Sequence, residues 1–289
     1  MRRFSAILLM AGLGIAASVE ALAQAPPPPM PPPSFTMQQL EGLVAPIALY
    51  PDPLLAQVLT ASTFSYQIPD AAGWSRAHSY ITGDALARAI TEDNLPWDPS
   101  VIALLPFPSV IDRMAGDMAW TSQLGNAVLA DRAAVMDAVQ DQRQKALNYG
   151  YLRTGPQYRV VPAPGAIEIL PVNPGAIFVP YYDPMVVYYR PRPGFFIGGA
   201  ITFGPQIFIG AAFAPWGWGS ISFAWGAHNI IVNNRPWGRV WGNRNAYIHP
   251  YPGPPRPATP APRVERHEMR EWHEPARGGG REERRDERR

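Results

Sequence analysis

Asp-Pro pairs are the most repeated chemically active motif in this sequence of 289 residues. There are three such pairs, and each comes shortly after an aromatic residue, in Tyr50-Pro51-Asp52-Pro53, Trp97-Asp98-Pro99 and Tyr182-Asp183-Pro184. An aspartate can act as a general acid or base, but it also suits a helix N-cap, where its carboxylate accepts hydrogen bonds from free amides and a following proline gives up an amide that had no partner. Repetition favours capping over a unique catalytic role. We predict that Asp52 and Asp98 are helix N-caps and that Asp183 is a turn residue.

Paired carboxylates are the catalytic arrangement that the sequence leaves open, because they have no sequence signature of their own. A hydrolase of cell-wall glycans could use Asp98 with Asp112 or Asp117. The sequence contains no Gly-x-Ser-x-Gly nucleophile motif and no phosphate-binding loop, and the lack of cysteine excludes a thiol nucleophile. An enzyme is therefore the alternative, and a structural or protein-interaction role is favoured.

Histidine is the remaining residue type that could bind a metal. The five histidines are His78, His228, His249, His267 and His273. The last two lie in HEMREWH, where their spacing does not give the i, i+4 pair of a zinc-binding helix. We predict no catalytic residue, no metal and no cofactor.

Residues 194–234 form a long uncharged stretch rich in glycine and aromatic residues, which we predict to contain short strands in ITFG, IFIG and ISFAWG. Pro205 and Pro215 argue against a membrane-spanning helix. The candidate interaction surface comprises Phe203, Phe208, Trp216, Trp218, Phe223 and Trp225. Three alternatives stay open: the strands complete the domain or stay partly disordered, they bind another envelope protein or a second copy, or they lie at a membrane surface. We expect the helical region to remain soluble without this segment.

The elements that must position these groups are helical in the first half of the chain. Apolar residues recur at intervals of three and four from residue 34 to residue 150. Thr36 and Gln39 predict a capping box at the start, and the longest helix is expected over residues 131–149, with Gly150 as a left-handed C-cap.

The pattern changes after Thr154 to short apolar runs separated by turn residues. We predict strands over residues 167–170, 176–182 and 185–189, forming a small antiparallel sheet that leans on the helical region. The fold class is therefore α+β: an N-terminal all-helical domain, a small antiparallel sheet and disordered low-complexity ends.

The N-terminus predicts export. Arg2 and Arg3 precede an uncharged run, and the small residues of Ala21-Leu22-Ala23 predict cleavage near Ala23, which places the mature protein in the periplasm or cell envelope. The expected organisation is a signal peptide (1–23), a proline-rich linker (24–33), a helical domain (34–150), a hairpin or sheet region (151–190), a Gly/aromatic-rich segment (191–247) and a proline-rich, then charged disordered tail (248–289).

Charge is unevenly distributed along the chain. Residues 34–150 contain 12 acids and 6 bases, a net of −6, whereas residues 151–262 contain 2 acids and 8 bases, a net of +6. The terminal stretch mixes 9 arginines with 8 acids and is typical of a solvated polyampholyte. We therefore predict no nucleic-acid partner.

Five ordered blocks carry a resemblance to a known family. They are LVAPIALYPDPLLAQVL, PWDPSVIALLPFPSVIDRM, WTSQLGNAVL, VMDAVQDQRQKA and IEILPVNPGAIFVPYYDPMVVY. Over roughly residues 38–190 the chain resembles the exported YacH-like proteins of Gram-negative bacteria, the DUF3300 family. The resemblance implies an envelope protein with no established activity and no catalytic residues to carry over.

Overall fold

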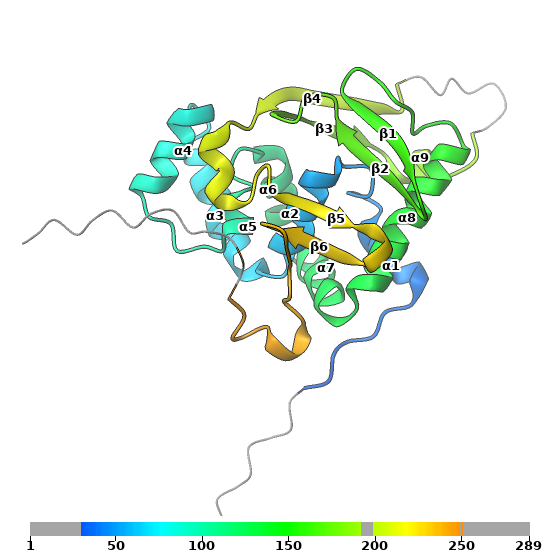
Figure 1. The fold of residues 1–289 in the computed structure, drawn as a ribbon, viewed down its shortest axis with the longest axis horizontal. Helices are drawn as coiled ribbons and strands as arrows, with labels where there is room; N and C mark the ends of the chain where they lie inside the picture. The colour runs from blue at the N-terminus through cyan, green and yellow to red at the C-terminus, as the bar shows by residue number, and fades with distance from the viewer. Residues whose placement is uncertain (1–29, 192–198, 249, 251–289) are drawn as a thin grey trace, which may run out of the picture.

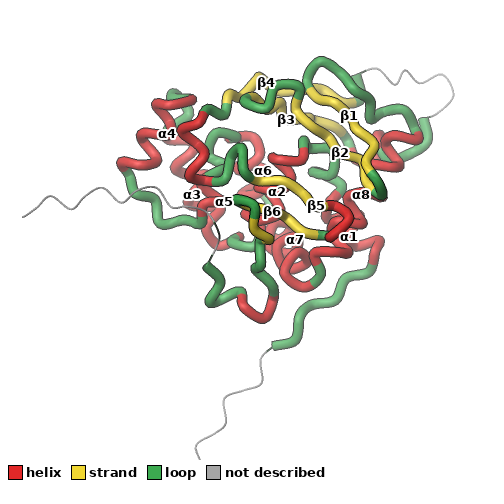
Figure 2. Tube along the Cα trace, in the orientation of Figure 1, coloured by secondary structure: helices red, strands yellow, loops and turns green. Residues whose placement is uncertain are grey.

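The computed structural model describes residues 30–191, 199–248 and 250, in which helices come first and strands follow (Figures 1 and 2). The α-helices are α1 (Met37–Val44), α2 (Asp52–Ser62), α3 (Ile68–Ala77), α4 (Gly83–Glu92), α5 (Pro99–Ile102), α6 (Pro108–Gly116), α7 (Met118–Ala130), α8 (Arg132–Asn148) and α9 (Pro184–Val187). The 3₁₀-helices are η1 (Ser65–Gln67), η2 (Ala211–Trp216), η3 (Trp225–Ala227) and η4 (Trp241–Asn243). The α+β prediction is confirmed.

The strands form small antiparallel sheets. They are β1 (Tyr158–Ala163), β2 (Ala166–Pro171), β3 (Ala176–Tyr182), β4 (Ile201–Phe208), β5 (Ile221–Ala224), β6 (Asn229–Val232) and β7 (Arg235–Pro236). β1 pairs with β2, β3 pairs with β4, and β5, β6 and β7 form a third sheet in that order. Figure 1 shows β3 and β4 along one side of the helices, and β5 and β6 across them.

Local capping explains where several helices begin and end. Thr36 and Gln39 form the predicted capping box of α1. Asp131 caps α8, the longest helix, by accepting a hydrogen bond from the Ala134 amide at 3.0 Å. Gly150 follows α8 with φ of 77°, a conformation that glycine adopts without the penalty of a Cβ atom. These predictions are confirmed.

A single hydrophobic core joins the two halves of the sequence. Helix α2 lies at its centre and is buried along almost its whole length, against α7, α5 and β5. Apolar side chains from the Gly/aromatic segment, among them Phe213, Trp216 and Trp237, belong to the same cluster as the leucines of α2. Most of this segment is therefore structured and completes the core, which was one of the three alternatives.

Two of the three predicted strands are confirmed, as β2 and β3, but the third is wrong. Residues 184–187 form the short helix α9, because Asp183 caps it through the Met185 amide at 2.8 Å and Pro184 occupies its first position. The boundary that we expected at residue 190, between the sheet region and the Gly/aromatic-rich segment, falls between β3 and β4. These two strands nevertheless pair with each other.

Candidate functional site

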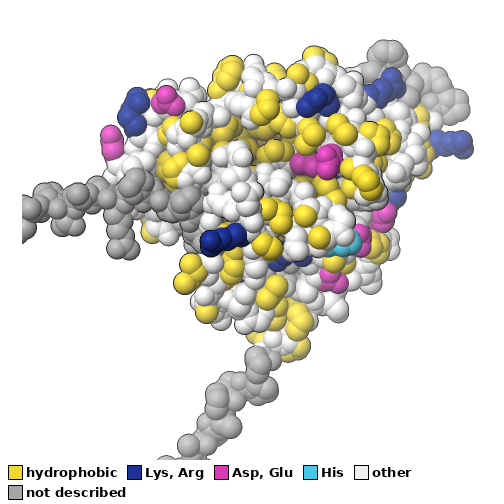
Figure 3. All heavy atoms as spheres, viewed as in Figure 1, with side chains coloured by type: hydrophobic (Ala, Val, Ile, Leu, Met, Phe, Trp, Pro, Cys, Tyr) yellow, Lys and Arg dark blue, Asp and Glu magenta, His cyan; other side chains and the backbone are white. Residues whose placement is uncertain are grey.

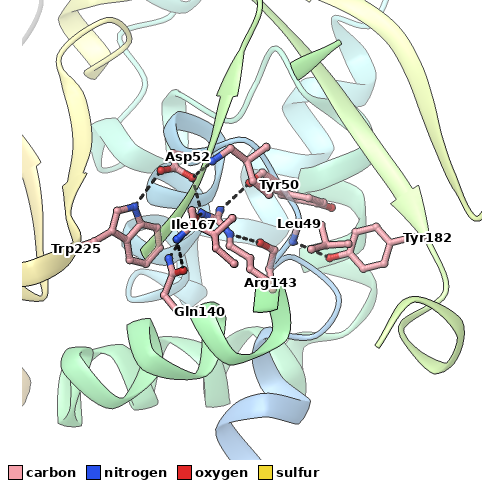
Figure 4. Close-up of polar contacts among 10 residues, drawn as sticks. Leu49, Tyr50, Asp52, Gln140, Arg143, Ile167, Tyr182 and Trp225 are labelled. Atoms are coloured by element: carbon pink, nitrogen blue, oxygen red, sulfur yellow. Dashed lines mark hydrogen bonds and ion pairs between the residues drawn. The ribbon is translucent and has the colours of Figure 1, made fainter. Parts of the chain in front are cut away.

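The polar centre of the core is Arg143, whose side chain is fully buried (Figure 4). Its Nη1 atom donates to Asp52 Oδ1 and to the Ile167 carbonyl, both at 2.7 Å. Its Nε and Nη2 atoms donate to the carbonyls of Ala48 at 2.8 Å and Tyr50 at 3.0 Å. Buried charges are tolerated when they are paired and hydrogen-bonded in this way.

Asp52 differs from its prediction. It is the first residue of α2 after the N-cap Pro51, and its side chain makes no capping bond. Instead Oδ1 accepts from Arg143 and from the Ile169 amide at 3.1 Å, and Oδ2 accepts from Trp225 Nε1 at 3.0 Å. The carboxylate is turned away from the helix end because a buried guanidinium offers a stronger, charge-assisted partner than a free amide. Asp52 therefore ties α2 to α8, β2 and η3.

The acids of the hydrolase alternative are each engaged in a local contact. Asp98 caps α5 through the Ser100 amide at 2.9 Å, which confirms its predicted role. Asp112 forms an exposed ion pair with Arg76 at 3.1 Å. Asp117 caps α7 through the Trp120 amide at 2.9 Å. Two of these acids thus serve as helix caps and the third belongs to a surface ion pair.

Two of the five histidines lie in the described residues. The His78 ring stacks on Trp74 with 3.8 Å between ring centroids, and its Nδ1 atom lies 2.9 Å from the Trp74 carbonyl. His228 pairs with Asp137 at 2.8 Å. Within the part of the chain that the structure describes, no group of three or more His, Asp or Glu side chains could hold a metal ion. His249, His267 and His273 lie outside it.

The six predicted surface aromatics divide into two groups. Trp216, Trp218 and Trp225 are buried, with 1%, 6% and 8% of their surface exposed, and Trp218 donates to the Ala103 carbonyl at 2.9 Å. They are covered by the helices of the same chain, so their assignment to an interaction surface is wrong. Phe203 and Phe223 are partly buried, whereas Phe208 is 63% exposed.

Phe208 lies at an apolar groove between β4 and the α3–α4 region, with a volume of about 490 Å³. Its lining includes Ser75, His78, Ile81, Leu86, Leu105, Pro106, Pro108, Pro205, Gln206, Ile207 and Phe208, and contains no Asp, Glu, Lys or Arg. Figure 3 shows hydrophobic side chains gathered below β4, where the surface is hollowed, with most charged side chains farther away. The size and the mostly apolar lining are those of a ligand-binding pocket.

The groove continues along the sheet. A smaller cavity of about 230 Å³ shares Pro108, Pro205 and Ile207 with it. β4 pairs with β3 on one side only, so its other edge carries backbone groups that no strand of its two-stranded sheet pairs. An unpaired strand edge beside an apolar groove can bind an extended segment through backbone hydrogen bonds and side-chain pockets.

The family model "Protein of unknown function (DUF3300)" matches residues 36–249. The chain belongs to the DUF3300 family. The match extends over the helices, the sheets and the aromatic segment, so this DUF3300 region coincides closely with the part of the chain that shares one core.

A curated relative is "Uncharacterized protein YacH" from Escherichia coli (strain K12), which is 34% identical over 187 residues. The matched region is 54% of this chain and 30% of the relative, so the chain spans less than a third of the length of that DUF3300 protein. No solved structure matches the chain.

Proposed function

We propose that this protein is an exported cell-envelope protein that binds an extended, apolar segment of another envelope protein along the free edge of β4. The observation that carries the proposal is the uncharged groove beside that edge, with Phe208 exposed at its rim. Backbone hydrogen bonds from the β4 edge would supply affinity. Ile81, Leu86 and Ile207 provide apolar contacts for every second side chain of the bound segment. Pro205 has no backbone N–H, so the β4 edge offers an added strand no donor at that position.

The lining chemistry favours binding over hydrolysis. Hydrolysis of a glycosidic bond uses two carboxyl groups that flank the bond, and no carboxylate lines this groove. Among the residues that the structure describes, none of the helices combines the length and the apolarity needed to cross a bilayer. The uncharged lining of the groove supports a protein partner ahead of a glycan substrate.

The test is site-specific photocrosslinking in intact cells from position 206, where Gln206 is exposed and lines the groove, followed by mass spectrometry of the captured species. We expect one partner protein, lost when Phe208→Asp places a charge in the groove and retained with Val172→Asp. Val172 is a matched control because it is 49% exposed and lies outside the groove. The captured segment, made as a peptide, should bind purified protein with the same dependence on Phe208. Crosslinks only to a second copy or to lipid would overturn the proposal.

Export rests on residues 1–23, which lie outside the described residues. We expect the mature protein to begin at Gln24 in the envelope fraction, because the small residues at Ala21 and Ala23 fit the cleavage pattern of signal peptidase. N-terminal sequencing after cell fractionation checks this. A cytosolic protein that still begins at Met1 would contradict export without affecting the binding groove.

A further inference from the structure

The chain after β7 forms a small lobe, residues 237–248, which Figure 1 shows projecting past β5 and β6. The lobe is braced from within by Asn243, whose side-chain oxygen accepts a hydrogen bond from the Val240 amide at 2.8 Å. Arg239 ties it to the core, because its Nη1 atom donates to the Thr63 carbonyl at 2.8 Å. The lobe therefore presents a fixed surface.

Trp241 is the half-buried aromatic residue at the start of η4 in this lobe. The guanidinium carbon of Arg244 lies 4.0 Å from the centroid of its ring, and the same guanidinium donates to the Trp241 carbonyl. Arg239 in turn donates through Nη2 to the Arg244 carbonyl at 2.8 Å. These contacts hold the indole in one orientation, with an Nε1 atom that can donate a hydrogen bond but cannot accept one.

The partner of this indole is distant in the sequence. Trp241 Nε1 donates to the Met30 carbonyl at 2.8 Å, across 211 positions. Met30 belongs to the run PPPPMPPP, residues 26–33, of which the structure describes residues 30–33. The proline-rich linker is therefore bonded to the lobe at residue 30.

The lobe and the proline-rich run have complementary hydrogen-bonding groups. Proline has no N–H, so the run offers mainly carbonyl acceptors. Residues 235–248 contain three arginines and two tryptophans, whose side chains only donate, and no Asp or Glu. Met30 and the prolines after it favour the polyproline II conformation, in which carbonyls have no internal partners. A segment of this kind binds an aromatic surface with little loss of entropy.

A second contact of the same kind lies beside the lobe. Asn233 Nδ2 donates to the Pro250 carbonyl at 2.9 Å, and Pro250 begins a second proline-rich run, residues 250–262. That contact spans only 17 positions, so the chain itself keeps its two partners close. The Trp241 contact brings together segments that the chain does not hold near each other, and it therefore reports recognition by the lobe.

We propose that the lobe is a binding site for a polyproline II segment and that residues 26–33 of the same chain are its ligand. Trp241 supplies the donor and the aromatic surface, and Arg244 holds the ring in place. In a mature chain that begins at Gln24, six residues precede Met30. They span about 19 Å as polyproline II, instead of about 31 Å for the whole linker of residues 24–33. The site is independent of the proposed binding of a protein segment beside β4.

The test is proton–nitrogen NMR of the full mature chain, in which the loss of one indole signal in Trp241→Phe identifies Trp241. We expect the triple variant Pro29→Gly, Pro31→Gly and Pro32→Gly to shift this signal and to speed its exchange with solvent about tenfold or more, because glycine makes the free linker more flexible. The matched control makes the same change in the second run, as Pro254→Gly, Pro257→Gly and Pro260→Gly, and should leave the signal unchanged.

The ligand can then be supplied separately. A synthetic peptide of residues 25–34, added to the triple linker variant, should restore the Trp241 signal along a saturable curve. The same peptide with glycine in place of the prolines should not restore it. The linker substitutions lie outside the hydrophobic core, so they test the site in a folded chain.

Three results would overturn the proposal. The first is a Trp241 signal that is unchanged in the triple linker variant. The second is a shift of that signal in the control variant of the second run, which would make that run the ligand. The third is equal restoration by the proline and glycine peptides, because the lobe would then not distinguish a polyproline II segment from any other chain.

Discussion

Arg143 and Asp52 show how strongly a single buried pair can be coupled to its surroundings. Removal of one partner leaves an uncompensated charge in the core, which costs about 3–5 kcal/mol. Loss of a helix N-cap costs only about 1 kcal/mol. The same substitution at two Asp-Pro motifs therefore separates the two roles.

We expect Asp52→Ala to lower the free energy of unfolding by about 3–5 kcal/mol, because Arg143 is fully buried and loses its carboxylate. Asp98→Ala, the matched control, should cost about 1 kcal/mol as the loss of a cap. Urea denaturation of the mature chain measures both. Equal losses at the two positions would mean that the buried pair contributes no more than a cap.

Buried tyrosines predict a loss of stability in alkali. Burial raises the pKa of Tyr50 and of Tyr158 to about 12, from an ordinary value of 10.0. Below pH 10 these phenols are neutral in both states and the stability is complete. Between pH 10 and 12 the unfolded state ionises while the folded state does not, so stability falls, by roughly 2–3 kcal/mol for each such tyrosine.

Urea midpoints at pH 9 and pH 11 check this expectation, with the lower midpoint at pH 11. Tyr158→Phe should reduce the difference, because it removes one ionisable group and keeps the ring that meets Phe203 edge-on at 5.4 Å. An unchanged difference in that variant would show that Tyr158 ionises alike in both states.

The two aspartates also show what the sequence could predict at the scale of a residue. Asp98 is a cap because the amide that it bonds belongs to Ser100, which lies two residues away and directly follows the motif. Asp52 has partners 91, 117 and 173 residues away, which no local pattern indicates. One signal was present: Gln142 and Arg143 fall on the same helix face as Val139 and Ala146, so polar residues interrupt an apolar stripe.

At the scale of elements, the crossing of α2 and α7 depends on a residue without a side chain. A Cβ atom added at Gly125 would lie 2.1 Å from the Ser62 carbonyl oxygen and 2.6 Å from its carbon. Both are backbone atoms, so a substitution must push the helices apart. Gly73 in α3 is exposed and has nothing within 4 Å of the equivalent position.

We therefore expect opposite effects from the same substitution. Gly125→Ala should destabilise the protein by about 1–3 kcal/mol or more through overpacking. Gly73→Ala should stabilise it by up to about 1 kcal/mol, because alanine favours the helix. Thermal unfolding followed by circular dichroism compares the two variants, and a stable Gly125→Ala protein would contradict the close helix crossing.

Element prediction succeeded where local signals agreed and failed where they conflicted. Capping residues and apolar spacing predicted α1 and α8. The run after Pro184 has strand-forming residues, but the N-cap Asp183 and Pro184 at the first position start the short helix α9 instead. β1 was not predicted, because Pro162 and exposed Arg159 interrupt its apolar pattern. The groove beside β4 comes from elements that meet only in three dimensions, so the sequence could not indicate it.

At the scale of the molecule, the aromatic segment is part of the core, which reverses the expectation that the helical region is soluble without it. A chain that ends at residue 191 lacks Trp216, Trp218 and Trp225 and exposes the face of α2 that they cover. We expect this fragment to aggregate, or to bind hydrophobic dyes and lose its near-ultraviolet circular dichroism. A chain that ends at residue 250 is the control and should unfold cooperatively. A monomeric fragment with a sharp thermal transition would contradict the shared core.

The contact between Trp225 and Asp52 also has a consequence for the time course of folding. These residues are 173 positions apart, and Arg239 bonds to Thr63 across 176 positions. Contacts at such separations slow folding, since a long loop must close before they form. During synthesis the helices are made first. At that stage α2 is still uncovered, and Arg143 still lacks the neighbours that come late in the chain. The native state becomes accessible only once residue 239 has emerged, and the chain must stay free of aggregation until then.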